Sequence, residues 1–422
     1  MSDTSSPYSP NASNDSTEPL ATENPASDEH VPLCTAEFHA NNLAFRAHLL
    51  ATSPLFAELA ALRDEGWKSA AADAYFAVKR ARAMQYKNKA QGKIQFGMYK
   101  RIIENLHRDL GIFDLRSSSR SSSPTTYASS VASSDVSFGF TNLTLRPDIQ
   151  DSEEPIKILD LCCAPGGFIS VATGHLPTAQ IHGITLPVRL GGFHVLKTRL
   201  PKASAAILQA DLTMFAGEFG FTADDIPPEH PDAKLFDFQR PFEGHEYDLV
   251  HYDGQVLVTH KRGEHREKYE ATRLMNSQLI MALQRLKPGG TLVAVMHKAE
   301  SWNTVLLLKA LSEISEEVRT WKPTTAFGIH SNFFIVAKGV DRVCEKAQRA
   351  LERWRSLWWQ ATAGQSPFKD DVGGSEETFR EVMEMEDRIR KWGEEAWKVQ
   401  IDALKKAEFI RAAREAGGTA AQ

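Results

Sequence analysis

The chain has 422 residues, a net charge of −5 and 24% charged residues. This length suffices for one large domain with appendages or for two domains. The slightly acidic balance excludes a protein coated in positive charge, so any contact with nucleic acid requires a local basic surface. The four cysteines form no C-x-x-C pair, which argues against a disulfide framework and a zinc site. The sequence therefore predicts no metal site.

The N-terminus is rich in Ser, Thr, Asn, Pro and Glu and lacks the apolar segment of a signal peptide. No apolar run approaches the roughly 18 residues of a membrane-spanning helix. We therefore expect a soluble, intracellular protein without membrane contact, and the sequence does not distinguish nucleus from cytoplasm. Residues 1–35 are polar and acidic, and we expect them to form a disordered tail.

Residues 36–115 combine a helical apolar pattern with an uneven charge distribution. Ten lysines and arginines within residues 68–108 accompany only two acidic residues. Three aromatic residues lie among these cations: Tyr86, Phe96 and Tyr99. The region therefore has cations that can bind the phosphates of a nucleic acid and aromatic rings that can stack on a base. A solvated helix surface accounts for the same pattern. The sequence leaves RNA binding and a solvated surface both open.

Residues 116–150 are serine-rich and of low complexity, which indicates a flexible insertion. Residues 151–340 alternate short apolar runs with helical segments, as in a doubly wound α/β sheet with right-handed crossovers. Seven strands are expected, at residues 156–161, 180–185, 205–209, 247–252, 291–297, 317–321 and 332–338. The predicted fold class is therefore α/β with a mostly parallel sheet.

Residues 341–422 form a charged helical extension in this interpretation. Apolar residues between Val382 and Ala403 keep a heptad-like spacing, which Gly393 interrupts. A helix packed on its own domain explains this pattern better than a coiled coil does. A protein partner at the C-terminal helices stays open, and the sequence does not determine the oligomeric state.

The most informative segment is IKILDLCCAPGGF, at residues 156–168. A short apolar strand is followed by a Pro-Gly-Gly turn and an apolar helix. Glycines without a Cβ let the backbone approach a bound cofactor, and a helix start presents free N–H groups. The segment is neither a dinucleotide fingerprint nor a phosphate loop. It therefore predicts a cofactor with little or no phosphate, held by a backbone turn and one carboxylate.

Three further motifs follow in order. ILQADLTMF carries a third strand with Asp211 near its end, YDLVHYDG places Asp253 directly after the fourth, and LKPGGTLVAVMHK brings the fifth strand to Lys298. Ligands of open α/β sheets bind at the carboxyl ends of the strands. We therefore expect these three residues and the Pro-Gly-Gly turn at one edge of the sheet.

This combination of motifs resembles the FtsJ/RrmJ-like family of S-adenosylmethionine-dependent RNA 2′-O-methyltransferases, in particular fungal FtsJ-domain proteins. The resemblance covers about residues 90–340. It implies a Rossmann-like class I methyltransferase fold, S-adenosyl-L-methionine as cofactor and RNA as partner. The residues implied to hold the methionine part of the cofactor are Asp160, Cys163, Ala164, Pro165, Gly166, Gly167 and Phe168. Asp211 is implied to accept a hydrogen bond from the adenine, with a helix N-cap as its alternative role.

By the same resemblance, a Lys-Asp-Lys-Glu tetrad surrounds the ribose hydroxyl. An alcohol is a poor nucleophile, so its proton must be removed while a methyl group is presented in line. Asp253 matches the aspartate and also borders the cofactor. Lys100 is the candidate for the first lysine, with Lys79 as the alternative. Val295 occupies the position of the second lysine, with Lys298 three residues further on. Asn332 stands at the glutamate position, where it can hydrogen-bond without carrying charge.

Three functions follow as hypotheses. The first is a methyltransferase that acts on an RNA ribose 2′-hydroxyl. The second is a catalytically impaired RNA- or protein-binding module on the same fold, which Val295 and Asn332 motivate. The third is a methyltransferase with a non-RNA acceptor, because a fold does not determine its substrate.

Overall fold

The computed structural model describes residues 35–84, 89–115, 154–196, 205–257, 259–365 and 372–419. The expected disordered tail, apart from Thr35, and the serine-rich segment lie outside these residues. Four helices precede the sheet: α1 (Ala36–Thr52), α2 (Pro54–Trp67), α3 (Ala70–Met84) and α4 (Lys89–Leu110). Among the described residues, no helix is long and apolar enough to cross a membrane.

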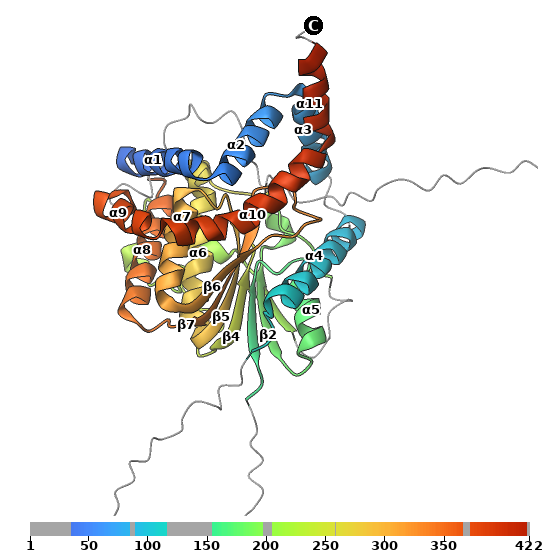
Figure 1. The fold of residues 1–422 in the computed structure, drawn as a ribbon. Coiled ribbons are helices and arrows are strands. Elements are labelled where there is room, and N and C mark those ends of the chain that lie inside the picture. The colour runs from blue at the N-terminus through green and yellow to red at the C-terminus, as the bar shows by residue number, and fades with distance from the viewer. Residues whose placement is uncertain are drawn as a thin grey trace, which may run out of the picture.

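The strands of the described residues form one sheet in the order β3-β2-β1-β4-β5-β7-β6 (Figure 1). They are β1 (Lys157–Leu161), β2 (Gln180–Thr185), β3 (Ala205–Gln209), β4 (Tyr247–Tyr252), β5 (Leu286–His297), β6 (Ser315–Trp321) and β7 (Asn332–Val340). Strands β1 to β5 pair in parallel, whereas β7 runs antiparallel to both β5 and β6. The predicted α/β fold class with seven mostly parallel strands is confirmed.

The sheet is buried on both faces because successive side chains of a strand point to opposite sides. Ile158 belongs to the core on the side of α4 and α5, and Leu159 to the core on the side of α6, α7 and α8. Figure 1 shows these two helical layers on either side of the sheet. Their bounds are α5 (Gly167–His175), α6 (Glu270–Arg285), α7 (Trp302–Ile314) and α8 (Glu345–Thr362).

The last helices of the chain pack against the first ones (Figure 1). They are α9 (Glu376–Glu384), α10 (Glu386–Lys406) and α11 (Glu408–Thr419). The buried ring of Trp397 on α10 lies 5.0 Å from that of Phe56 on α2. Arg63 of α2 pairs with the buried Glu300 after β5 at 2.5 Å and donates to Gln400 of α10 at 2.7 Å. Arg63 therefore connects α2 and α10, which come from the two ends of the chain, to the loop after β5.

We predict that Arg63→Met lowers the free energy of unfolding by about 3–5 kcal/mol, because it leaves the Glu300 carboxylate buried without its partner. The Arg63 charge lowers the pKa of Glu300, so the stability that the pair contributes is present at neutral pH and is lost as the pH falls through that pKa. Denaturant titration at several pH values measures both effects.

Two controls accompany this variant. Lys68→Met breaks an exposed pair with Asp64 and should cost under about 1 kcal/mol. The double variant Arg63→Met/Glu300→Gln should recover part of the loss, since it removes the unpaired charge. A double variant no more stable than Arg63→Met would contradict this account.

Candidate active site

The turn between β1 and α5 lies at the carboxyl edge of the parallel strands. Gly166 precedes α5 as its N-cap with φ 106°, a backbone that side chains rarely adopt, and Cys162 has φ 65°. Strands β2 and β4 flank β1 on its two sides. The turn therefore stands where open α/β sheets bind ligands.

Gly167 lets α4 pack directly against the start of α5. A Cβ at this position would lie 3.0 Å from the Tyr99 Cβ and 3.2 Å from both the Lys100 nitrogen and the Phe96 carbonyl oxygen. These approaches are tighter than side-chain atoms normally make. The absence of a side chain at Gly167 thus allows the close packing of α4 that sets the position of Tyr99.

A cavity lies at this edge of the sheet. The predicted residues in its wall are Asp160, Cys163, Ala164, Pro165, Gly167, Phe168, Asp211, Asp253 and Asn332. Gly166 is not part of the wall and serves as the N-cap of α5. Residues that the sequence did not single out for the site also line it, among them Gln95, Thr213, His251 and Lys261.

His251 joins the two central strands inside this cavity. It lies opposite Asp160 in the register of β1 and β4, and its Nδ1 is 2.7 Å from the Asp160 Oδ1. Both side chains are 1% exposed. The Phe168 ring stacks on the imidazole with centroids 4.1 Å and planes 4° apart. Sequence reasoning missed His251, for which the one signal was a histidine between Val250 and Tyr252 in a buried strand.

Tyr99 extends this contact toward Asp253. Its hydroxyl lies 3.0 Å from the His251 Nε2 and also hydrogen-bonds the Asp253 carboxyl group. The turn that carries Asp253 is held by Gln278 of α6, which accepts from the Gly254 N–H at 2.7 Å and donates to its carbonyl at 3.2 Å. Four polar side chains therefore form one hydrogen-bonded chain: Asp160, His251, Tyr99 and Asp253.

Burial changes the acidity of these groups. It raises the pKa of Asp253 to about 6, because desolvation disfavours the charged form, and the nearby His251 opposes this shift. Burial likewise raises the pKa of Asp160. The thiols of Cys162 and Cys163 have pKa values raised well above the usual range, again by burial, and stay protonated at neutral pH. Both cysteines are therefore packing residues and not nucleophiles.

Asp211 has the structural role that the sequence left as an alternative. Its Oδ1 accepts hydrogen bonds from the Thr213 backbone N–H at 3.0 Å and from the Thr213 hydroxyl at 2.7 Å. It thereby caps the short 3₁₀ helix Leu212–Met214. The same side chain lines the cavity. Capping engages one carboxylate oxygen, so it is compatible with a contact to a ligand.

The structure does not bring Lys100 and Lys298 into the cavity wall. Lys100 is exposed on α4, one position after the inward-facing Tyr99. Lys298 follows the end of β5 with φ 49°, and its Nζ lies 5.8 Å from the centre of the exposed Trp67 ring. The residues whose interactions shift the pKa of Asp253 are His251, Tyr99 and Asp160. Both lysines lie outside the wall of the cavity that Asp253 lines.

The cavity wall fits the cofactor that the resemblance implies. Three of its buried polar atoms have no hydrogen-bond partner within the described ranges: Asp160 Oδ2, Gln95 Nε2 and Asn332 Oδ1. Buried polar atoms are nearly always paired, so atoms of this kind in a cavity wall suit a polar ligand. Two acceptors and one donor match an amino-acid group, which has both an ammonium and a carboxylate.

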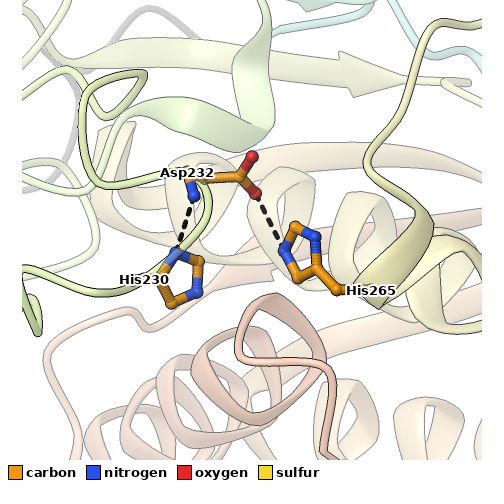
Figure 2. A group of neighbouring side chains, drawn as sticks. All are labelled: His230, Asp232 and His265. Carbon is orange, nitrogen blue, oxygen red and sulfur yellow. Dashed lines mark hydrogen bonds and ion pairs between the residues drawn. The ribbon is translucent and has the colours of Figure 1, made fainter.

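A separate cluster of His230, Asp232 and His265 is the group of the described residues with the geometry to hold a metal ion (Figure 2). The His230 Nδ1 accepts from the Asp232 backbone N–H at 3.0 Å, and its Nε2 lies 3.3 Å from the Thr362 carbonyl. Arg266 donates to the Asp232 Oδ2 at 2.6 Å, and the same oxygen faces His265 at 3.3 Å. These contacts account for the cluster as an ion-pair network without a metal.

We predict that Gly167→Ala destabilises the protein by about 1–3 kcal/mol, because the added Cβ forces α4 away from α5. Gly174→Ala on the same helix is the matched control. A Cβ at Gly174 meets nothing within 4 Å, so this variant should be stabilised by about 0.4–1 kcal/mol. Denaturant titration of both variants tests the difference, and equal losses would contradict the role given to Gly167.

Solved structures with partial likeness to this chain include methyltransferases. Human Methyltransferase-like protein 13 in complex with SAH is 12% identical with a TM-score of 0.28, over 52% of this chain and 87% of that one. An O-methyltransferase family protein from Burkholderia thailandensis is 12% identical with a TM-score of 0.24, over 44% of this chain and 51% of that one.

Sequence comparison identifies the central part of the chain. The Ribosomal RNA large subunit methyltransferase E of Caulobacter vibrioides is 29% identical over 184 residues, which are 43% of this chain and 66% of that protein. The FtsJ-like methyltransferase family matches residues 148–340, the segment that contains the whole sheet and the cavity residues after α4. Residues 148–340 therefore match the FtsJ-like methyltransferase family that the sequence motifs predicted, a family whose cofactor is S-adenosyl-L-methionine.

Proposed function

We propose that this protein transfers a methyl group from S-adenosyl-L-methionine to a ribose 2′-hydroxyl of RNA. The observation that carries the proposal is that the turn after β1 and the Asp253 carboxyl group share one cavity. A hydroxyl group in this cavity would meet a methyl donor and a carboxylate together. Holding both reactants in one geometry contributes much of the rate of a bimolecular transfer.

The cofactor would be held by residues of the chain that already lie in the cavity wall. Asp160 and the turn at residues 163–168 would hold the methionine part, with the unpaired Asp160 Oδ2 accepting from its ammonium. Asp211 would accept from the adenine with the carboxylate oxygen that does not cap the 3₁₀ helix. When bound, the cofactor supplies a methyl group on a positively charged sulfur.

Cations near the cavity support RNA as the acceptor. Lys93, Lys100 and Arg101 are exposed on α4, the helix whose Tyr99 reaches into the cavity. Lys261 is exposed as well and is itself part of the cavity wall. Lysines and arginines in this arrangement contact phosphates and give salt-dependent affinity. The curated relative that acts on ribosomal RNA is consistent with this acceptor class.

A second candidate function is a cofactor-binding module without transfer activity. The observation that favours it is that Val295 lines the cavity where the family has a lysine, while Lys100 and Lys298 lie outside the wall. A methyltransferase with a non-RNA acceptor is the third candidate, because the cavity itself does not specify a ribose.

We predict that the purified protein transfers the labelled methyl group of S-adenosyl-L-methionine to total RNA. Digestion to nucleosides should recover the label in 2′-O-methylnucleosides. Asp253→Asn should reduce the rate by at least about 10²-fold, the typical contribution of a positioned acid or base. The exposed Asp224→Asn is the matched control and should keep the rate. Label on bases or on protein would contradict the ribose acceptor, and cofactor binding without any transfer would favour the binding module.

We also predict that affinity for S-adenosyl-L-methionine rises between pH 5 and pH 7. The pKa of Asp253 is about 6, so a rise in pH through this range leaves the carboxylate ionised, which favours a positively charged sulfur. The gain is at most about tenfold per pH unit below that pKa. Calorimetric titration should find a weaker dependence for S-adenosylhomocysteine, which lacks this charge. An unchanged dependence in Asp253→Asn would assign the titration to another group.

A further inference from the structure

We propose that the buried hydrogen-bonded chain is a proton relay, in which Asp253 takes the proton of the acceptor hydroxyl and Tyr99 and His251 carry it inward. Asp160 is the buried end of the relay and stabilises the charge that arrives on the imidazole. The inference rests on the proposed methyl transfer. It assigns the role of the base to a carboxylate and not to the lysine that the resemblance implies.

The hydrogen-bonded side chains run without a break from the cavity to the sheet. The Tyr99 hydroxyl bonds Asp253 on one side and lies 3.0 Å from the His251 Nε2 on the other. The His251 Nδ1 lies 2.7 Å from Asp160. Phe168 stacks on the imidazole and holds its plane. The Tyr99–His251 and His251–Asp160 contacts are within hydrogen-bond distance, as proton transfer requires.

The donors and acceptors determine where the hydrogens lie. An ionised Asp160 can only accept, so the His251 Nδ1 carries a hydrogen and donates it to this carboxylate. A neutral His251 then has a lone pair at Nε2. The Tyr99 hydroxyl has one hydrogen, which it donates to the ionised Asp253 carboxylate at rest and turns toward the His251 Nε2 once Asp253 is protonated. The other lone pairs of the Asp253 carboxylate stay available for a hydroxyl group in the cavity.

During methyl transfer, the proton of the acceptor hydroxyl passes first to Asp253. The acceptor oxygen forms a bond to the methyl carbon, the electron pair of the C–S bond stays on sulfur, and the hydroxyl proton passes to Asp253. Protonated Asp253 then donates to the Tyr99 oxygen while Tyr99 gives its own hydrogen to the His251 Nε2. The products are an ionised Asp253, a neutral tyrosine and an imidazolium.

The surroundings suit a base that works near neutral pH. Burial raises the pKa of Asp253 to about 6, and the efficiency of a general base is highest when its pKa lies near the operating pH. The titratable groups that face Asp253 are Asp160, His251, Tyr99, Cys162 and Cys163. Burial raises the pKa values of the two thiols and of the phenol well above the usual range, so these groups stay protonated near neutral pH.

Tyr99→Phe tests the relay because it removes only the central hydroxyl. We expect kcat for RNA methylation to fall at least about tenfold, while calorimetry finds cofactor affinity within about twofold of the wild type. The Tyr99 hydrogen bond lowers the pKa of Asp253, so its loss should move the acid limb of kcat/KM to higher pH. Tyr252→Phe is the matched control: it removes another buried hydroxyl, which contacts Met296, and should change none of these quantities.

A second readout does not depend on turnover. Proton release on cofactor binding is obtained by calorimetry at pH 6 in two buffers of different ionisation enthalpy. At a given pH a higher pKa means more protonated Asp253, so Tyr99→Phe should release more protons than the wild type, and Asp253→Asn fewer. Tyr252→Phe should release the wild-type number.

His251→Asn completes the test. Its amide can still donate to Asp160 but offers no Nε2 to Tyr99, so we expect a loss of kcat similar to that of Tyr99→Phe. The double variant should lose little more than either single variant, because groups that act as one unit are not additive. Retained cofactor affinity in each variant confirms that it has folded.

The outcomes separate the relay from the function on which it rests. A Tyr99→Phe variant with wild-type kcat, pH profile and proton release would overturn the relay and leave RNA methylation intact. A wild-type protein that binds the cofactor but methylates no RNA would overturn the proposed function, and the relay for this acceptor with it.

Discussion

The hydrogen bond between Asp160 and His251 is the constraint on which the site depends. A carboxylate buried in the middle of a parallel sheet is costly unless a partner compensates its charge. The register of β1 and β4 places the imidazole directly opposite this carboxylate at 2.7 Å. The paired strands carry the cofactor turn on one side and Asp253 on the other. One interstrand contact therefore sets the distance between the place for the methyl donor and the place for the acceptor.

The helices outside the sheet determine which side chains reach this contact. The bare backbone at Gly167 lets α4 approach, so Tyr99 enters the cavity while its neighbour Lys100 faces solvent. In the loop after β5, Glu300 pairs with Arg63 and so ties α2 to the sheet. Lys298 precedes this anchor and lies over the Trp67 ring at the end of α2. The packing of the terminal helices thus excludes one lysine, and the rotation of α4 excludes the other.

In this arrangement the proposed base is a carboxylate, whereas in a lysine-based site it is an amine. Burial is the main influence on Asp253 and moves its pKa toward neutrality. A carboxylate in this state can accept a proton and still attract a positively charged sulfur when ionised. Its partner Tyr99 provides a path to the imidazole, whose charge Asp160 compensates. Val295 on β5 and Asn332 on β7 line the same cavity as Tyr99 of α4, Asp160 of β1 and His251 of β4.

The sequence by itself determined the fold class, the strands and the edge where the cofactor turn lies, because apolar periodicity and glycine turns are local signals that the backbone obeys. The predicted bounds of β1, β2, β3 and β4 agree with the structure to within one residue at both ends. The match of the central segment to the FtsJ-like methyltransferase family followed from the same motifs. Tertiary structure alone decided that Asp160 faces His251, that Tyr99 enters the cavity and that Lys298 turns away. These outcomes depend on strand register, on the rotation of a helix and on contacts between the two ends of the chain, and no local pattern encodes the meeting of residues so far apart.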